Sequence, residues 1–320
     1  MTTKREFLPQ GVTRRERTAE QIAAAEPFGL DYPATQVGVV GNITVSYDPD
    51  LGAQGLALAQ QMLNFVAGPY NDMETLFGIA GGAVTVVIAP LSGNNNGYGG
   101  AYHYGCDFSN GGVLYLDATF ANTTVDPLQL EIGLYVAELS ESFMGPQNLG
   151  WGCGFSNGEG LSRFLAKEET AAGTLDAFTT GPAWAQAGFP DWVSQTEQTD
   201  RNPVSTGCAI VYIYFMRNVL EYTIDQIVQG GGATLAQNYQ NVHGKDPSTA
   251  YPDLMGALNG LQVTTDNPFP NLYGMSESPS AVLWKGGISV LHQGISDNGR
   301  FGTRIPMAPE TRPKIRTFRA

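Results

Sequence analysis

The sequence predicts an α+β fold in which a strand-rich part is followed by a mainly helical part. Two observations predict this order. Short β-branched, apolar runs that are typical of buried strands occur at 42–47, 83–89 and 112–117. From about Gln129 onward, apolar residues recur at helical spacing instead. With 42% hydrophobic and 15% charged residues, the 320-residue chain has the composition of a folded protein.

Each helix is predicted from its local pattern. A short helix is expected around 18–25, where Thr18 can cap the N-terminus ahead of Glu20 and Gln21. A longer one is expected over 51–65, with apolar residues suited to packing on the strands. After the helix that begins near Gln129, further helices are expected at 202–220, 223–228 and 234–242.

Changes in pattern divide the chain into four predicted parts. These are an N-terminal arm (1–35), a strand-rich subdomain (36–128), a helical subdomain (129–263) and a C-terminal extension (264–320). Two short apolar runs in the extension indicate a hairpin, and prolines interrupt the basic tail that follows it.

Charge is distributed unevenly along the chain. The net charge is −13, yet residues 1–20 carry +2 and residues 300–320 carry +5, so that 6 basic and 26 acidic side chains remain in 21–299. An acidic body repels nucleic acid, which we exclude as a partner. The basic ends predict that a tail docks on an acidic surface, its own or a neighbour's, and hence a homo-oligomer. Solvated, unpaired ends are the alternative.

Membrane and export signals are missing from the sequence. No stretch approaches the roughly 20 apolar residues that cross a bilayer. The first residues also lack the apolar core of a secretion signal. We therefore expect a cytoplasmic protein with no membrane span, although a removed leader or a non-classical export route would leave the same pattern.

The three cysteines are Cys106, Cys153 and Cys208. They cannot all pair within one chain, and none forms a C-x-x-C motif, so neither a redox pair nor a cysteine zinc knuckle is indicated. We expect them to be small buried hydrophobic residues. A bridge between Cys106 and Cys153 is the alternative.

The most informative stretch is A-E-L-S-E at 137–141, followed by Glu159 in the phrase E-G-L-S-R-F-L-A. It resembles the zinc-binding core of the gluzincin metallopeptidases, the thermolysin and aminopeptidase superfamily, with both histidines of H-E-x-x-H missing. The resemblance puts Glu138 at the general-base position and Glu159 at the third-ligand position. Ala137 and Glu141 then occupy the two histidine positions.

The resemblance covers roughly residues 80–262 and implies a gluzincin-like fold, with strands before the motif helix and a buried helix after it. Alanine has no donor atom, and a carboxylate is a harder ligand than imidazole, so zinc is not expected. Glu141 and Glu159 would at most hold a nonstandard divalent cation, and no other cofactor is expected. The resemblance therefore implies a protein that has lost peptidase activity and acts in binding or self-assembly, with the old cleft kept for a peptide or sugar ligand.

Three other interpretations of the glutamates remain open. They can be solvated residues on the polar face of an ordinary amphipathic helix. They can form a carboxylate cluster for calcium or another hard cation. Finally, Glu138, Glu141 and Glu159 can serve a hydrolase, peptidase-like or glycosidase-like, with a nonstandard metal or none.

His103 is the only histidine near the predicted cleft. Folding can bring it to Glu138, where it would act as acid, base or ligand. The alternative is a loop histidine hydrogen-bonded to the backbone. The tyrosines on either side of it, Tyr102 and Tyr104, are either a platform for a ligand or simple packing.

Overall fold

A computed structural model describes residues 4–9, 15–26, 29–92, 100–109, 112–118 and 125–269. All of them belong to one structural unit, Met1–Lys285. The hairpin and the basic tail predicted within 264–320 lie outside the described residues, apart from the first six positions of that extension.

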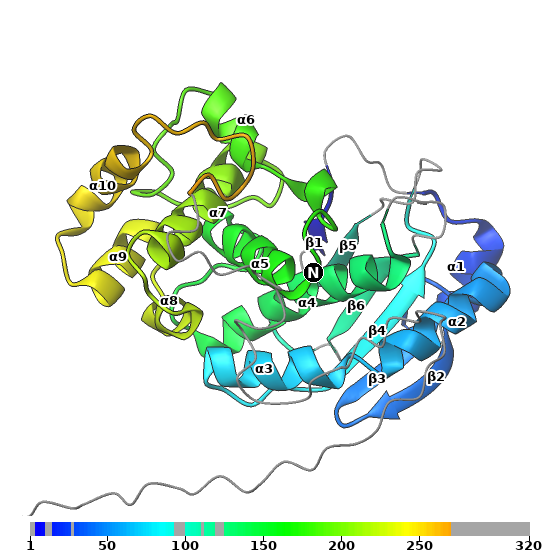
Figure 1. Cartoon of the computed structure of the whole chain (residues 1–320). Helices are drawn as coiled ribbons and strands as arrows, with labels where there is room; N and C mark the ends of the chain where they lie inside the picture. The colour runs from blue at the N-terminus through cyan, green and yellow to red at the C-terminus, as the bar shows by residue number, and fades with distance from the viewer. Residues whose placement is uncertain are drawn as a thin grey trace, which may run out of the picture. The chain divides into compact units, whose positions relative to one another are not determined.

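A mixed sheet of six strands occupies the first part of the chain (Figure 1). The strands are β1 (Lys4–Phe7), β2 (Thr35–Val40), β3 (Ile43–Tyr47), β4 (Val84–Ala89), β5 (Ala101–Tyr104) and β6 (Val113–Asp117). Their order across the sheet is β1-β5-β6-β4-β3-β2. The neighbours β3, β4 and β6 are parallel, whereas β2, β5 and β1 run antiparallel to the strands beside them. Together with the helices that follow, this sheet confirms the predicted α+β class.

The two faces of the sheet pack differently because side chains alternate along each strand. Val86, Ile88 and Leu114 belong to the main core, which the helices after the strands complete. On the alternate positions, Val87 and Tyr115 join a smaller cluster under the segment around Tyr32. The sheet is therefore buried on both faces over its central strands.

Ten α-helices lie within the described residues (Figure 1). They are α1 (Ala19–Ala25), α2 (Gly52–Leu63), α3 (Ala67–Phe77), α4 (Pro127–Gln147), α5 (Ser156–Glu169), α6 (Gly181–Gln186), α7 (Pro203–Asn218), α8 (Ile224–Gly230), α9 (Leu235–His243) and α10 (Ala250–Ala257), with short 3-10 turns η2 (Pro49–Leu51), η3 (Asp176–Phe178) and η4 (Pro247–Thr249). None of these helices is long and apolar enough to span a bilayer.

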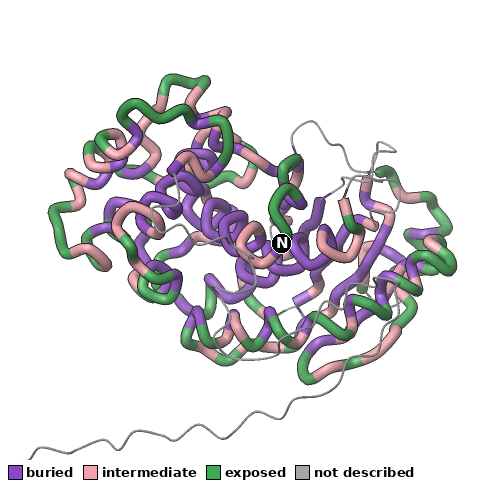
Figure 2. The backbone as a smooth tube through the Cα atoms, in the orientation of Figure 1, coloured by how far each residue is buried: buried purple, intermediate pink, exposed green. Residues whose placement is uncertain are grey.

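Helix α4 is buried nearly all round, as the continuous purple tube in Figure 2 shows. It packs against β5 and β6 on the sheet and against α5, which in turn packs on α7. Because neighbours cover every side, the glutamates of α4 are not solvated, and the interpretation of this segment as an ordinary amphipathic surface helix is wrong.

Most predicted elements are confirmed within a few residues. The expected cap at Thr18 is present as a capping box with Gln21. Local patterns did not predict β1, β2, β5, α3, α6 or α10, however. The alternative that His103 is a loop residue is wrong, because it lies on β5, which pairs with β6 on one side and with β1 of the distant N-terminal arm on the other.

Cys106 and Cys153 form a disulfide, so the expectation that both are free is wrong and the alternative bridge is the one that forms. Cys106 follows β5 and Cys153 precedes α5, and folding brings their Cα atoms to 5.6 Å, within the range for a disulfide. Cys208 is free and fully buried, as expected.

Candidate functional site

The four residues singled out from the sequence meet in one buried group, which we call the acidic cluster: His103, Glu138, Glu141 and Glu159. His103 comes from β5, Glu138 and Glu141 from α4, and Glu159 from α5. Each is at most 2% exposed. Charged side chains are rarely buried to this extent unless they are paired, so the cluster requires compensation from its neighbours.

Glycines of the E-G-L phrase allow α5 to bring Glu159 into this position. A Cβ atom at Gly160 would lie 2.5 Å from the Cβ atom of Ala209 on α7, and one at Gly158 would lie 2.1 Å from the carbonyl oxygen of Gly152. Neither approach is open to a larger residue without movement of the backbone. The tight packing of α5 therefore depends on the two residues that flank Glu159.

His103 and Glu138 form a hydrogen-bonded pair. The Nδ1 atom of His103 lies 2.6 Å from a carboxylate oxygen of Glu138. Burial lowers the pKa of His103, while the carboxylate of Glu141 opposes this shift. A neutral imidazole that donates its Nδ1–H to Glu138 is consistent with both the short distance and the lowered pKa. Its Nε2 atom is then a lone-pair donor, and it lies 3.7 Å from Cys153 Sγ.

Glu141 and Glu159 form a second pair. Burial raises the pKa of both carboxyl groups, and the charge of Glu141 raises the pKa of Glu159 further. A hydrogen bond links the two side chains, and Ser162 also bonds Glu141. Two carboxyl groups can bond each other only if one of them carries a proton. The pair therefore holds a proton at pH values where an exposed glutamate would be ionised.

Arg163 is the nearest basic residue to this pair, one turn after Glu159. Its guanidinium lies 3.6 Å from a Glu159 oxygen, donates a hydrogen bond to the carbonyl of Phe178 and stacks over the ring of Phe7. The sequence analysis missed Arg163, although its spacing of four from Glu159 is the spacing of a helical ion pair.

Strand β1 borders the acidic cluster. It pairs antiparallel with β5, with Arg5 opposite His103 and Phe7 opposite Ala101. Phe7 is 1% exposed and stacks on Phe178 with 4.4 Å between ring centroids. Residues of the N-terminal arm therefore belong to the site, which no local sequence signal indicated.

Another buried carboxyl group on α4 also escaped the sequence analysis. Glu131 lies two turns before Glu138 and is fully buried, and neither of its oxygens has a hydrogen-bond partner among the described residues. Burial raises its pKa well above the usual value, and the nearby charge of Asp117 adds to the shift.

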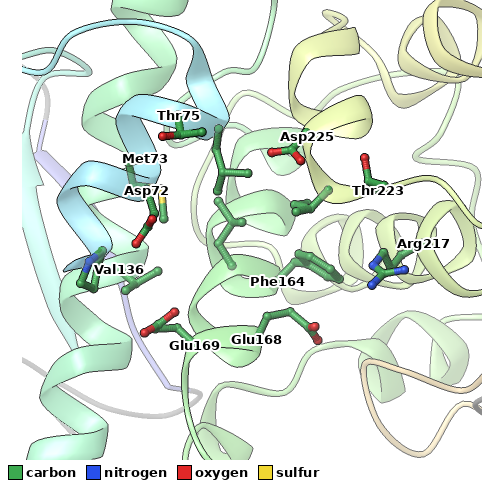
Figure 3. A pocket seen from close by; sticks show the side chains of 14 residues that line it. Asp72, Met73, Thr75, Val136, Phe164, Glu168, Glu169, Arg217, Thr223 and Asp225 are labelled. Carbon is green, nitrogen blue, oxygen red and sulfur yellow. The ribbon is translucent and has the colours of Figure 1, made fainter. Parts of the chain in front are cut away.

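An open cavity of about 330 Å³ lies elsewhere, among α3, α4, α5 and α8 (Figure 3). Asp72, Glu168, Glu169 and Asp225 give it an acidic wall, with Arg217 at one side. Burial, together with the charge of Glu169, raises the pKa of Asp72 to about 7. None of the four residues of the acidic cluster lines this cavity.

Two sets of residues bear on metal binding. The helix positions 137, 141 and 159 supply one methyl group and two carboxylates, which do not fit a zinc site built from imidazoles. A different trio, His103, Glu141 and Cys153, has its candidate ligand atoms within 4.8 Å of one another. As part of a disulfide, however, the Cys153 sulfur is not a thiolate and cannot serve as a normal metal ligand.

Comparison with known proteins adds no assignment. The sequence matches no protein-family model, and no curated protein matches it.

Proposed function

We propose that this protein is a non-catalytic, gluzincin-like protein that binds an extended peptide segment along the edge of β5. The observation that carries the proposal is the position of β1, which lies antiparallel on that edge with Arg5 directly opposite His103. In this structure the bound segment is the protein's own N-terminal arm.

The edge of β5 is suited to an exchangeable strand. A strand edge offers a row of backbone donors and acceptors, and an added strand gains affinity from them in any sequence. Because β1 is joined to β5 by no hairpin and comes from the far end of the chain, the same edge can accept an equivalent segment from another molecule.

Side chains around β1 supply selectivity. Phe7 fills a buried position between Phe178 and Arg163. On the outer edge of β1, the backbone N–H of Glu6 donates a hydrogen bond to the carboxylate of Asp200. The side-chain carboxylate of Glu6 forms an ion pair with Arg201 at 3.0 Å. We therefore expect ligands with an aromatic residue at the Phe7 position.

A cavity lies beside the residues that follow β1. It measures about 260 Å³ and is lined by Leu8 and Pro9 of the arm together with Arg163, Asp200 and Arg201. A segment longer than β1 can follow the same course, which favours a peptide over a sugar as the ligand.

The chemistry of the acidic cluster supports binding rather than cleavage. Ala137 supplies no ligand at the first metal position, and a carboxylate oxygen of Glu138 lies 2.6 Å from His103 Nδ1. The proton held between Glu141 and Glu159 further reduces their capacity as ligands of a hard cation.

Exchange of β1 between copies would produce the self-assembly expected from the sequence. The basic tail at 300–320 is a second predicted contact, and it lies outside the described residues. Deleting it should lower the mass measured by light scattering, and high salt should do the same. The cytoplasmic location also remains a prediction, and the Cys106–Cys153 disulfide is more typical of an oxidising compartment.

Strand binding can be tested with a fluorescent peptide of residues 1–9 and a variant that lacks them. The truncated protein should bind the peptide, as measured by anisotropy, whereas the full-length protein should bind it at least about tenfold more weakly because its own arm competes. The same peptide with Phe7→Ala is the control and should bind more weakly. Equal binding by both proteins, or by both peptides, would contradict the proposal.

A hydrolase is the second candidate, and the paired carboxyl groups with raised pKa values favour it, because such groups serve as general acids. The truncated protein should be incubated with the same peptide and with oligosaccharides. Cleavage that Glu138→Gln abolishes would replace the binding proposal. An intact peptide after prolonged incubation would support it.

A further inference from the structure

We propose that reduction of the Cys106–Cys153 disulfide creates a site for a zinc-like transition-metal ion, with Cys153 Sγ, His103 Nε2 and a carboxylate oxygen of Glu141 as ligands. The site is independent of the strand-binding proposal. It uses one helix position and two residues from other elements, β5 and the turn before α5.

The geometry of the three atoms suits a tetrahedral ion. Zinc–nitrogen bonds of about 2.0–2.1 Å and zinc–sulfur bonds of about 2.3 Å, at a tetrahedral angle, place the two ligand atoms roughly 3.6 Å apart. The observed separation of His103 Nε2 and Cys153 Sγ is 3.7 Å. All three ligand atoms lie within 4.8 Å of one another, so modest rotation of Glu141 completes the arrangement.

Two neighbouring carboxyl groups orient the ligands. Glu138 accepts the Nδ1–H of His103, which leaves Nε2 as the coordinating atom. A carboxylate behind a ligating histidine is a regular feature of metal sites because it sets the tautomer and strengthens the ligand. Glu159 stands behind Glu141 in the same way, through their shared hydrogen bond.

A buried oxygen without a partner is the second observation that points to a cation. Glu141 is 2% exposed, and one of its carboxylate oxygens has no hydrogen-bond partner among the described residues. A dication bound to Glu141 and to a Cys153 thiolate would offset the negative charge of these two ligands. The combination of sulfur, imidazole and carboxylate favours Zn²⁺ or Co²⁺ over Mg²⁺ or Ca²⁺.

The two sulfurs differ in accessibility, which sets the course of reduction. Cys106 is half-buried and Cys153 is buried. A thiolate of an external dithiol attacks Cys106 Sγ, the S–S bond breaks, and Cys153 leaves as a thiolate beside His103. The second thiol of the reagent then displaces Cys106, so the dithiol becomes a cyclic disulfide and supplies both electrons. Binding of the ion to the Cys153 thiolate completes the site.

Cobalt titration of chelator-treated protein tests the proposal, because a thiolate ligand produces a sulfur-to-cobalt charge-transfer band in the near ultraviolet. Cys106→Ser and Cys153→Ser both remove the disulfide, but only the first leaves the sulfur ligand in place. Cys106→Ser should therefore bind one Co²⁺ with the band and without any reductant, whereas Cys153→Ser should lack the band. Wild-type protein should show it only after reduction by a dithiol.

Variants of the remaining groups sharpen the result. Glu138→Gln should weaken the affinity for Co²⁺ by about 10–100-fold, the usual effect of removing a carboxylate behind a ligating histidine. Cys208→Ser should retain the band and controls for an unrelated buried thiol. Circular dichroism establishes that each variant is folded. A folded Cys106→Ser protein without the band, or an identical band in the Cys153→Ser or oxidised wild-type protein, would overturn the proposal.

Discussion

The acidic cluster and the open cavity of Figure 3 both use residues of α4 and α5, but they bury carboxyl groups to different extents. In the cluster, β1 and the packed helices seal off Glu138, Glu141 and Glu159, which are at most 2% exposed. In the cavity, Asp72 is only partly buried and Glu168 and Glu169 share the wall with it.

The difference shows that burial, rather than residue type, decides what a carboxyl group requires. A sealed carboxylate must be compensated by a proton, an arginine or a metal ion, because water does not reach it. A carboxyl group at the open cavity, such as Asp72, keeps part of its contact with solvent, although burial still raises its pKa to about 7. Changes at the sealed site should therefore have larger effects than matched changes at the open one.

The largest effect is expected from Arg163→Met, which removes the basic partner of Glu159. At pH 8 it should lower the free energy of unfolding by about 3–5 kcal/mol, as expected when a buried ion pair loses one member. The loss should be smaller at pH 5, where Glu159 can take up a proton. Arg217→Met at the cavity is the matched control and should change stability by less than about 1 kcal/mol. Equal losses in urea unfolding would mean that the two sites do not differ.

Loss of the disulfide should have the next largest effect. A bridge that closes a sequence separation of 47 residues contributes up to about 4 kcal/mol through the entropy of the unfolded chain. Cys106→Ser should therefore unfold at lower urea concentration, and a dithiol should bring the metal-free wild-type protein to the same midpoint without affecting the variant. If the dithiol left the urea midpoint of the wild-type protein unchanged, this result would argue against the Cys106–Cys153 disulfide.

Substitution of helix glycines should change the stability by an intermediate amount at the buried site and little at the open cavity. Gly160→Ala places a Cβ atom 2.5 Å from Ala209 and should destabilise the protein by about 1–3 kcal/mol, because α5 cannot move away from α7 without disturbing the acidic cluster. Gly68→Ala in α3, beside the open cavity, meets no atom within 4 Å and should be neutral or gain up to about 1 kcal/mol. Thermal unfolding of both variants measures the contrast, and a neutral Gly160→Ala would show that the α5–α7 packing is looser than described.

The smallest effects should appear in the pH dependence of stability. Glu131 has a pKa raised by burial, so its folded form retains a proton after the unfolded chain has ionised, and stability falls as pH rises above its usual value of 4.5. Glu131→Gln should match wild-type stability near pH 4 and exceed it increasingly as pH rises.

Asp72→Asn should show the same sign at the open cavity but a weaker trend, which levels off above pH 7 because its pKa is about 7 and solvent screens it. Urea unfolding between pH 4 and pH 8 measures both trends. A stability gap that shrinks with rising pH would reverse the assignment of Glu131 as a protonated group.

Local patterns were sufficient for the elements that carry the glutamates. The apolar runs predicted β3, β4 and β6, helical spacing predicted α4 and α7, and the resemblance implied α5. The phrases around Glu138 and Glu159 also led to the expectation that these side chains meet, and the structure brings them together. Strand β5 was missed, since its four residues, A-Y-H-Y, carry no clear alternation of apolar and polar positions.

The sequence by itself determined which chemical groups are present: a helix with glutamates at 138 and 141, a following helix that brings Glu159, and no donor atom at Ala137. These features depend on residues a few positions apart. Only the tertiary structure decided that β1 borders the cluster, that His103 engages Glu138, that Cys106 joins Cys153 and that the Glu141–Glu159 pair retains a proton. Strand pairing and desolvation depend on groups brought together from distant parts of the chain, so they cannot be predicted from a local sequence pattern.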